Sequence, residues 1–517
     1  MIPWKRLDYL AHRWTGLVLG ALVFVWFSSG IVMVFYPWPA LTESRQLALL
    51  EPFSLGPPLV GFSRAAAAAT EHLARADASP FNEQGAPVFG RLMRWGDRLV
   101  YQFSSEQSGR YVPAVLVDAR NGTVLSPVQP DMAAVVARRI VGPTPHVSAI
   151  DRLVVGDHYM MNHDYAAGFP AYRVEFTDPD RTAVYVSVRG GEPFGVVTTR
   201  TRLTTWFGTV PHWFYFMWLY RRSQAWLAVA VATTSLGTFL ALTGIVLGAY
   251  QLRPRKNGGK WRPSPHHGVS KWHHLAGIFF GLIVLTWTFS AVLENLGEDN
   301  NPRSGQGALA RGGAVRWEAV RITEADALAR LRRGWPSVAA PIAIDVLQVR
   351  GRPGYDFHLV DGRELWVDAA TGDVRSELAM ADARAVAASI LGDSVPIETV
   401  DRLTAYDTYY YTRPGRQMHL PVWRVRFADQ ERSTVYLDAV NGTPTGFVNR
   451  AVRRARWLRD ALHSYDYPAL NHRRILWYCI VLPLLFGGLA SSGSGVVLLV
   501  RRVKRLRLAN GGQMPAP

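Results

Sequence analysis

Four stretches of the chain are apolar throughout and contain no charged side chain. They are residues 14–36, 225–250, 275–293 and 475–500. Each is close to or above the length of about 20 apolar residues that crosses a bilayer core. The pattern therefore predicts four membrane-spanning helices. The first apolar run is too long for a cleaved signal peptide, and no small-residue cleavage site ends it before Pro37.

Basic residues mark one side of these spans. All five lysines flank apolar stretches, and neither the loop 251–271 nor the tail 501–517 contains an acidic residue. Under the positive-inside rule, both segments and the N-terminus are cytoplasmic. The long segments 37–211 and 294–462 then lie outside, which in a bacterial inner membrane means the periplasm. The net charge of +17 thus reflects membrane sidedness, and we expect no nucleic-acid partner.

The spans and their sidedness predict eight consecutive segments. They are an N-terminal segment with the first span (1–36), a periplasmic domain (37–211), an edge segment with the second span (212–250), a basic cytoplasmic loop (251–271), the third span (272–293), a second periplasmic domain (294–462), an edge segment with the fourth span (463–500) and a basic cytoplasmic tail (501–517).

The two halves of the chain resemble each other in sequence. PAYRVEF at residues 170–176 matches PVWRVRF at 421–427, an offset of 251 (421 − 170). Between the first and third spans the offset is 261 (273 − 12). Residues related by one of these offsets include His12 and His273, Ser29 and Ser290, His212 and His463, and Thr243-Gly244 and Ser494-Gly495. Both halves begin inside, so the repeat is parallel and its pseudo-twofold axis is expected along the membrane normal.

Each outer domain is predicted to contain two small α+β units. Helices are expected at 62–74, 131–140, 322–333 and 380–391. Strands that run into a glycine-containing turn are expected at 116–122, 365–372 and 436–442, with a degenerate copy at 185–187. The predicted fold is a four-helix transmembrane bundle with two periplasmic α+β domains, duplicated within the chain.

The combined motifs resemble a known family, the PepSY-associated transmembrane proteins, which include inner-membrane reductases of ferric siderophores. The matching motifs are HRWTG at 12–16, HHLAG at 273–277, VDA at 117–119 and 367–369, Thr243-Gly244 and Ser494-Gly495. The resemblance covers nearly the whole chain. It implies PepSY-like units in the periplasm, haem b between the spans and electron transfer across the membrane.

Four of the 14 histidines lie at span edges in repeat-related pairs. Symmetry predicts that His12 and His273 bind one haem iron in the cytoplasmic leaflet, and that His212 and His463 bind a second in the periplasmic leaflet. His274 is an alternative to His273, and His472 is an alternative to His463. The chain contains no Cys-x-x-Cys-His motif, which excludes covalent attachment of a c-type haem. The competing interpretation is that edge histidines only anchor the helices at the interface.

Arginines near the span ends are candidates for contacts to haem propionates, because a guanidinium presents forked donors to a carboxylate. The candidates are Arg13, Arg222 and Arg473, with Arg221 and Arg474 beside them. Anchoring to lipid phosphates is the competing role for these side chains.

These features favour an oxidoreductase that reduces a ferric siderophore, or another ferric chelate, in the periplasm. No catalytic residue is identified. No G-x-G-x-x-G follows a predicted strand, so the electron donor is expected to be a separate cytoplasmic protein or a quinol. The single cysteine, Cys479, excludes an internal disulfide and a cysteine-ligated iron–sulfur cluster. The alternative is a non-enzymatic, membrane-anchored PepSY protein that restrains a peptidase or binds a partner.

Overall fold

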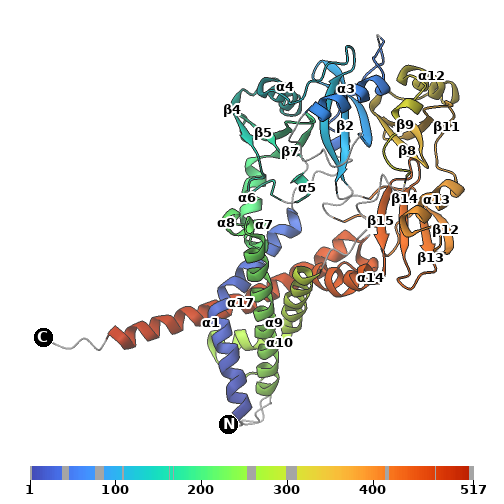
Figure 1. Cartoon of the computed structure of the whole chain (residues 1–517). Helices are drawn as coiled ribbons and strands as arrows, with labels where there is room; N and C mark the ends of the chain where they lie inside the picture. Colours follow the sequence, from blue (N-terminus) through green and yellow to red (C-terminus); the bar gives the residue numbers. More distant parts are fainter. Residues whose placement is uncertain are drawn as a thin grey trace. The chain divides into compact units, whose positions relative to one another are not determined.

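A computed structural model describes most of the chain (Figure 1). The described residues are 3–37, 46–56, 58–75, 87–107, 110–161, 163–166, 168–252, 263–297, 311–413, 418–471 and 473–511. The chain divides into two compact units. Unit 1 comprises Met1–Trp38, Leu203–Glu298 and Arg453–Pro517, and unit 2 comprises Pro39–Arg202 and Asp299–Val452. Each unit therefore contains segments from both halves of the repeat.

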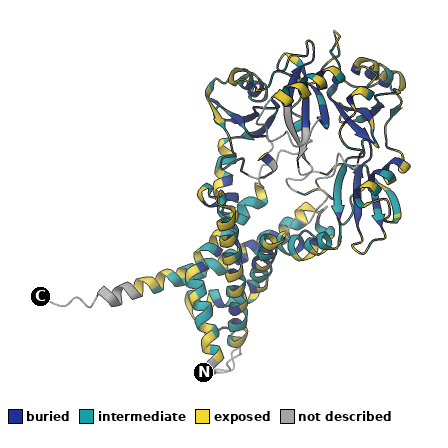
Figure 2. Cartoon of the chain, viewed as in Figure 1, coloured by how far each residue is buried: buried dark blue, intermediate teal, exposed yellow. Residues whose placement is uncertain are grey.

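Unit 1 is built on four long helices, and each contains one of the predicted spans. They are α1 (Pro3–Phe35), α9 (Ser223–Gln251), α10 (Gly268–Leu296) and α17 (Arg474–Gly511). All four are long and apolar enough to cross a membrane. Large apolar side chains such as Val18, Phe279 and Ile475 are more than 70% exposed on them, and Figure 2 shows exposed residues along each helix. An exposed apolar surface of this extent favours lipid around unit 1.

The four helices pack according to the repeat. Helix α1 packs along α9 and α17, and its repeat mate α10 packs along the same two helices. Short helical segments precede the second and fourth spans. In the first half these are α6 (Thr199–Phe207), α7 (Thr209–Trp213) and α8 (Met217–Tyr220), and in the second half α14 (Arg450–Ala455), the π-helix η2 (Arg456–Ala461), α15 (Leu462–Ser464) and α16 (Pro468–Asn471). Residues 253–262, which hold most of the basic loop's charges, lie outside the described residues.

Unit 2 contains three antiparallel sheets. The largest has seven strands in the order β11-β10-β9-β8-β1-β2-β3. Its strands are β1 (Phe89–Trp95), β2 (Arg98–Gln107), β3 (Arg110–Asp118), β8 (Pro341–Val349), β9 (Arg352–Leu359), β10 (Glu364–Asp368) and β11 (Val374–Arg375). One four-stranded sheet is formed by β4 (Val147–Leu153), β5 (Ala171–Phe176), β6 (Ala183–Ser187) and β7 (Pro193–Val197). The other is formed by β12 (Ile397–Leu403), β13 (Val422–Phe427), β14 (Thr434–Asp438) and β15 (Pro444–Val448).

Helices pack on these sheets where the sequence predicts them. Helices α3 (Phe62–Arg75) and α12 (Glu324–Gly334) and the 3₁₀ turn η1 (Trp317–Ala319) pack on the seven-stranded sheet. Helix α4 (Pro130–Val141) packs on β4–β6, and α13 (Met380–Leu391) packs on β12–β14. A single turn, α5 (His163–Ala166), precedes β5. The expected α+β units are therefore present in both halves.

The predicted strand–turns share one hydrogen-bonding pattern. Asp118, Asp368 and Asp438 each end a strand, and one carboxylate oxygen of each accepts hydrogen bonds from the backbone N–H groups two and three residues later. The glycines that follow, Gly122, Gly372 and Gly442, have φ of 78°, 81° and 72°. Only glycine adopts this backbone region without a steric cost, which explains why the motif ends on glycine.

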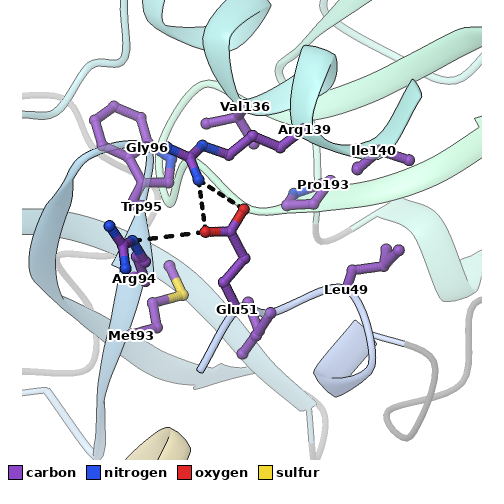
Figure 3. Close-up of a pocket in the computed structure, with 11 residues that line it drawn as sticks. Leu49, Glu51, Met93, Arg94, Trp95, Gly96, Val136, Arg139, Ile140 and Pro193 are labelled. Carbon is purple, nitrogen blue, oxygen red and sulfur yellow. Dashed lines mark hydrogen bonds and ion pairs between the residues drawn. The ribbon is translucent and has the colours of Figure 1, made fainter. Parts of the chain in front are cut away.

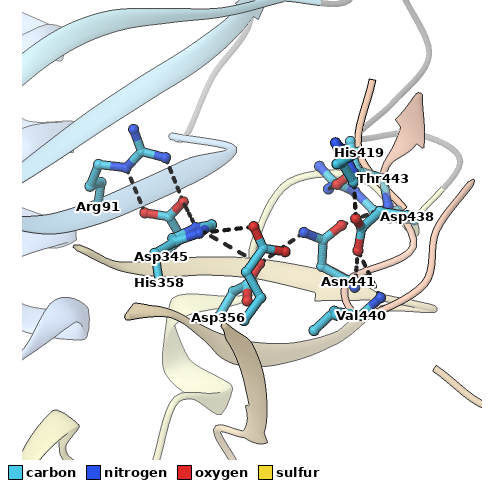
Figure 4. Close-up of polar contacts among 11 residues, drawn as sticks. Arg91, Asp345, Asp356, His358, His419, Asp438, Val440, Asn441 and Thr443 are labelled. Carbon is cyan, nitrogen blue, oxygen red and sulfur yellow. Dashed lines mark hydrogen bonds and ion pairs between the residues drawn. The ribbon is translucent and has the colours of Figure 1, made fainter. Parts of the chain in front are cut away.

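The pairing of β1 with β8 joins the two outer segments into one sheet. The sequence analysis predicts two separate outer domains and gives no indication of this pairing. Arg91 in β1 lies opposite Asp345 in β8, and these residues occupy equivalent places in the repeat. The Arg91 guanidinium donates to both carboxylate oxygens of Asp345, at 2.7 and 2.6 Å (Figure 4). Opposite charges at the centre favour pairing between the two different halves.

Further buried polar groups extend this ion pair (Figure 4). Nε2 of His358 in β9 lies 2.9 Å from Oδ2 of Asp345, and the side-chain amide of Asn441 donates to Oδ2 of Asp356 at 2.8 Å. Burial alone would raise the pKa of Asp345, but the charges of Arg91 and His358 outweigh burial and lower this pKa to about 2. Burial would lower the pKa of His358, and the carboxylates of Asp345 and Asp356 raise it instead. Asp345 is therefore an anion held between two cations.

Glu192 should make the stability of unit 2 depend on pH. Burial raises the pKa of Glu192 to about 7 from a model-peptide value of 4.5, and Gln102 donates to its carboxylate at 2.9 Å. The folded state then binds more protons than the unfolded state between these values, so stability falls as pH rises from about 4.5 to about 7. In the unaltered protein we expect Glu192 to lower the unfolding free energy by roughly 2–3 kcal/mol over this pH range, and Glu192→Gln to abolish this decrease. Urea unfolding of the full chain at pH 5 and pH 7.5 tests this, and an unchanged pH slope in the variant would contradict it.

Candidate functional site

The inner histidine pair lies between helices α1 and α10. The rings of His12 and His273 are 6.2 Å apart between centroids, with an angle of 42° between their planes. The two residues come from repeat-related helices and are the pair that the repeat symmetry predicts. The structure therefore brings together side chains that lie one full repeat, 261 residues (273 − 12), apart in the sequence.

The outer pair is formed by His212 on α7 and His463 on α15. Their ring centroids are 6.3 Å apart, and the ring planes are inclined at 73°. Helix α7 packs against α1, and α15 packs against α10. The second symmetric pair is thus also assembled, in an arrangement that matches the first.

The spacing of both pairs suits two imidazoles on one metal ion. Imidazole nitrogens bind metals at about 2.0–2.1 Å, so two rings on opposite sides of one ion have centroids roughly 6 Å apart. The measured 6.2 and 6.3 Å agree with this geometry. Among the described residues, no group of three or more His, Cys, Asp and Glu side chains could hold a metal ion. Each pair thus offers two imidazoles at a spacing that suits one metal ion between them.

The inner rings are oriented by hydrogen bonds at Nδ1. His12 Nδ1 lies 3.1 Å from the carbonyl oxygen of Leu240, and His273 Nδ1 lies 3.1 Å from that of Ser491. Because a carbonyl only accepts, Nδ1 carries the proton in each ring. The lone pair of each neutral ring is then on Nε2. Thr243 and Ser494 place hydroxyl oxygens at 3.3 and 3.2 Å from the same Nδ1 atoms.

The outer rings have the same tautomer for a related reason. Nδ1 of His212 lies 3.0 Å from Ser29 Oγ, and Nδ1 of His463 lies 3.1 Å from Ser290 Oγ. Each serine already donates its hydroxyl proton to a backbone carbonyl of its own helix, so it accepts from the histidine. For these four rings the described residues provide no hydrogen bond to Nε2. Histidines that bind metals characteristically donate their second ring N–H in this way.

Glycines allow the inner histidines to approach the neighbouring helices. A Cβ atom at Gly244 would lie 2.8 Å from Cε1 of His12, and one at Gly495 would lie 3.3 Å from Cε1 of His273. A side chain at Gly244 would displace the ring, and one at Gly495 would crowd it. The Thr243-Gly244 and Ser494-Gly495 matches are therefore explained by one residue that orients the ring and one that makes room for it.

Two different irregularities precede the outer histidines. In the first half, Gly208 separates α6 from α7, whereas in the second half the π-helix η2 continues into α15. The two irregularities lie at equivalent places in the repeat. Phe214 and Tyr465 then follow two residues after the histidines, with φ of 55° and 52°. This left-handed conformation costs a bulky residue about 1–2 kcal/mol.

His274 and His472, the alternative ligands, are placed differently. His274 is buried, and its Nδ1 and Nε2 lie 3.0 Å from Ser264 Oγ and 3.3 Å from the carbonyl oxygen of Gly248. Both ring nitrogens are therefore engaged, so His273 rather than His274 faces His12. His472 lies outside the described residues. His266, which precedes α10, hydrogen-bonds Gln251 at 2.6 Å.

The predicted arginines lie at the ends of the spans. Arg13 stacks over the ring of Trp14 at 5.7 Å, Arg222 is exposed and donates to the carbonyl of Trp218 at 2.8 Å, and Arg473 is exposed. Arg456 on η2 was not identified from the sequence. It is only 3% exposed and lies 3.5 Å from Asp466. Its repeat mate is Thr205, so the repeat gave no signal for a buried cation near His463.

An apolar layer separates the two histidine pairs. Ser29 and Ser290, which contact the outer pair, follow the inner histidines by 17 residues (29 − 12 and 290 − 273). At 1.5 Å per residue this is about 25 Å along the helices. The bundle interior contains the buried side chains of Leu19, Val23, Phe27, Trp287, Val481 and Leu485. The two pairs thus lie near opposite ends of a water-excluding bundle.

A small pocket in unit 2 does not form a comparable site (Figure 3). It has a volume of about 40 Å³ and is lined by Met93, Trp95 and Val136 among other residues. The Glu51 carboxylate lies in it and pairs with Arg139 at 2.5 Å and with Arg94 at 3.5 Å. The pocket is too small for a ferric chelate, and both of its arginines already pair with its one carboxylate.

Comparison of the chain with protein-family models and with curated proteins finds no match. The functional assignment therefore rests on the residues and geometry of the histidine pairs.

Proposed function

We propose that this protein is a PepSY-type transmembrane electron-transfer protein of the bacterial inner membrane. In this proposal it holds two b-type haems, one by His12 and His273 and one by His212 and His463, and reduces a ferric siderophore or another ferric chelate in the periplasm. The proposal is carried by the two ring spacings of 6.2 and 6.3 Å. In all four rings Nδ1 is hydrogen-bonded, and the described residues leave Nε2 without a hydrogen bond.

The residues present fit haem b. It needs no covalent attachment, and two imidazoles complete the coordination of its iron. Bound haem would supply one-electron redox chemistry, and iron(II) binds the hard oxygen ligands of a siderophore less tightly than iron(III) does. The four histidines would supply the axial nitrogens, and the Nδ1 partners would fix the ring orientations.

The chain contributes position and environment. The apolar layer around Phe27 and Trp287 excludes water between the two sites. The separation of about 25 Å along the helices would place the two haems near opposite faces of a bilayer core of ~30 Å. Arg456 is a buried cation close in sequence to His463 and is a better candidate for a propionate contact than the exposed Arg222 and Arg473.

The alternative, a PepSY regulator without redox activity, gives no role to the histidine pairs. A membrane anchor would not need two symmetric histidine pairs whose Nδ1 atoms are all hydrogen-bonded. A donor separate from this chain, a cytoplasmic protein or a quinol, remains part of the proposal.

Reduction across a vesicle membrane tests this function. The protein is reconstituted into vesicles that enclose dithionite, with a ferric hydroxamate chelate and an iron(II) indicator outside. We expect iron(II) to form outside the vesicles only when the protein is present. With His12→Ala it should form at least about tenfold more slowly, because the variant lacks a ligand of one of the two haems that would carry the electron. A rate equal to that of protein-free vesicles would contradict the proposal.

A further inference from the structure

The turns that follow the outer histidines are strained in the same way in both halves. Phe214 caps α7 and Tyr465 caps α15, both in the left-handed conformation that usually requires glycine. A bulky residue persists there only when its surroundings hold it. The strain begins two residues after His212 and His463, so it acts directly on the backbone that carries these imidazoles.

Tryptophans of the spans hold both turns. The indole N–H of Trp226 donates to the carbonyl of Trp213 at 2.8 Å, and that of Trp477 donates to the carbonyl of Ser464 at 3.0 Å. These carbonyls lie between the histidine and the strained residue. They also belong to the last turn of a short helix, where carbonyls lack helical partners. Trp226 and Trp477 occupy equivalent positions in the repeat.

Aromatic contacts from the first and third spans hold the side chains of the two strained residues. Trp26 on α1 contacts the ring of Phe214 at 5.9 Å, and its repeat mate Trp287 on α10 contacts the ring of Tyr465 at 5.7 Å. Trp287 also donates to the carbonyl of His463 at 2.6 Å. The aromatic side chains at 214 and 465 thus make contacts that glycine could not make, which accounts for their presence despite the strained backbone.

We infer that Trp226 and Trp477 are positioning residues for the outer haem, which clamp the strained turns and thereby set the orientation of His212 and His463. This inference rests on the proposed function, because it assigns a purpose to the imidazole orientation. The indole hydrogen bond to the turn and the aromatic contact occur in both halves, although the preceding helices differ, one broken at Gly208 and one continued through a π-helix. The contacts that clamp the turns are therefore shared by both halves, whereas the helices that lead to the two histidines differ.

The test uses the full-length protein with Trp226→Phe, Trp477→Phe and the control Trp218→Phe. Phenylalanine keeps most of the ring but removes the N–H donor. Trp218 is 67% exposed and stacks on Phe216, so its replacement leaves both turns intact. We expect the first two variants to lose the outer haem to a haem-scavenging globin about tenfold faster, and to shift its electron paramagnetic resonance signal, with the inner haem unchanged. Hydrogen exchange at residues 462–467 should rise in Trp477→Phe, with or without haem.

Rescue separates a clamp from general destabilisation. Adding Tyr465→Gly to Trp477→Phe should slow haem loss again in part, because glycine adopts the left-handed conformation without strain but gives up the contact of the Tyr465 ring with Trp287. Failure of this rescue, or behaviour of Trp226→Phe and Trp477→Phe identical to that of Trp218→Phe, would overturn the clamp alone. Absence of haem from the unaltered protein would overturn the proposed function, and unchanged hydrogen exchange in Trp477→Phe would then overturn the clamp separately.

Discussion

His463→Ala should remove the outer haem and leave the inner haem in place. The imidazole would be one of two axial ligands, and among the described residues it is the ring that faces His212, with its Nδ1 hydrogen-bonded to Ser290. We expect the purified variant to contain about half of the haem of the unaltered protein, and His12→Ala to lose the other half, since each site uses one histidine from each half of the repeat. Pyridine haemochrome absorbance per mole of protein measures this.

His274→Ala is the matched control for these variants. His274 is next to His273, is buried, and uses both ring nitrogens within the protein. Its replacement should therefore retain both haems even if it weakens the end of the bundle that holds His12 and His273. Loss of all haem from His463→Ala alone, or of the inner haem from His274→Ala, would contradict the assignment of the pairs.

Asp345→Ala should destabilise unit 2 by about 3–5 kcal/mol, because it leaves the buried charges of Arg91 and His358 without their shared partner. The Asp345 side chain is 4% exposed and the Arg91 side chain is 12% exposed, so solvent cannot replace the lost carboxylate. The measurement is the unfolding free energy of the full-length protein in urea, followed by tryptophan fluorescence. A loss below about 1 kcal/mol would mean that the pair behaves like an exposed one.

Two further variants identify the cause of this loss. Asp151→Ala removes a carboxylate that pairs with Arg173 at 2.7 Å but is 48% exposed, and it should cost less than about 1 kcal/mol. Replacing both partners, as Arg91→Met with Asp345→Leu, should recover much of the loss, because the buried guanidinium is removed together with its partner and His358 still has Glu364 at 3.3 Å. If the double variant is as unstable as Asp345→Ala, the charge pair is not the reason for the loss.

The sequence was sufficient for features that depend on local pattern or on the repeat. Uncharged runs predict the four long helices, and the two offsets identify which histidines meet. The offsets work because a parallel duplication about one axis brings equivalent residues together, as His12 and His273 show. The strand–turns ending in Gly122, Gly372 and Gly442 were also predictable, since the motif carries its own hydrogen bonds.

Features that depend on non-local pairing were not predictable from one sequence. The pairing of β1 with β8 joins strands about half the chain apart, and neither strand signals its neighbour by its own alternation. Arg456 could not be distinguished from the many exposed arginines, because burial is a property of the packed bundle. The left-handed conformations of Phe214 and Tyr465 were equally hidden, since nothing in an aromatic residue predicts a position that normally requires glycine.

The visible spectrum of the purified protein, air-oxidised and then reduced with dithionite, shows whether the histidine pairs bind haem. After expression with adequate haem supply, we expect a Soret band and, on reduction, sharp α and β bands typical of six-coordinate haem with two imidazole ligands. A protein without a Soret band, or one whose reduced spectrum shows five-coordinate haem, would contradict the assignment of His12, His273, His212 and His463 as paired ligands.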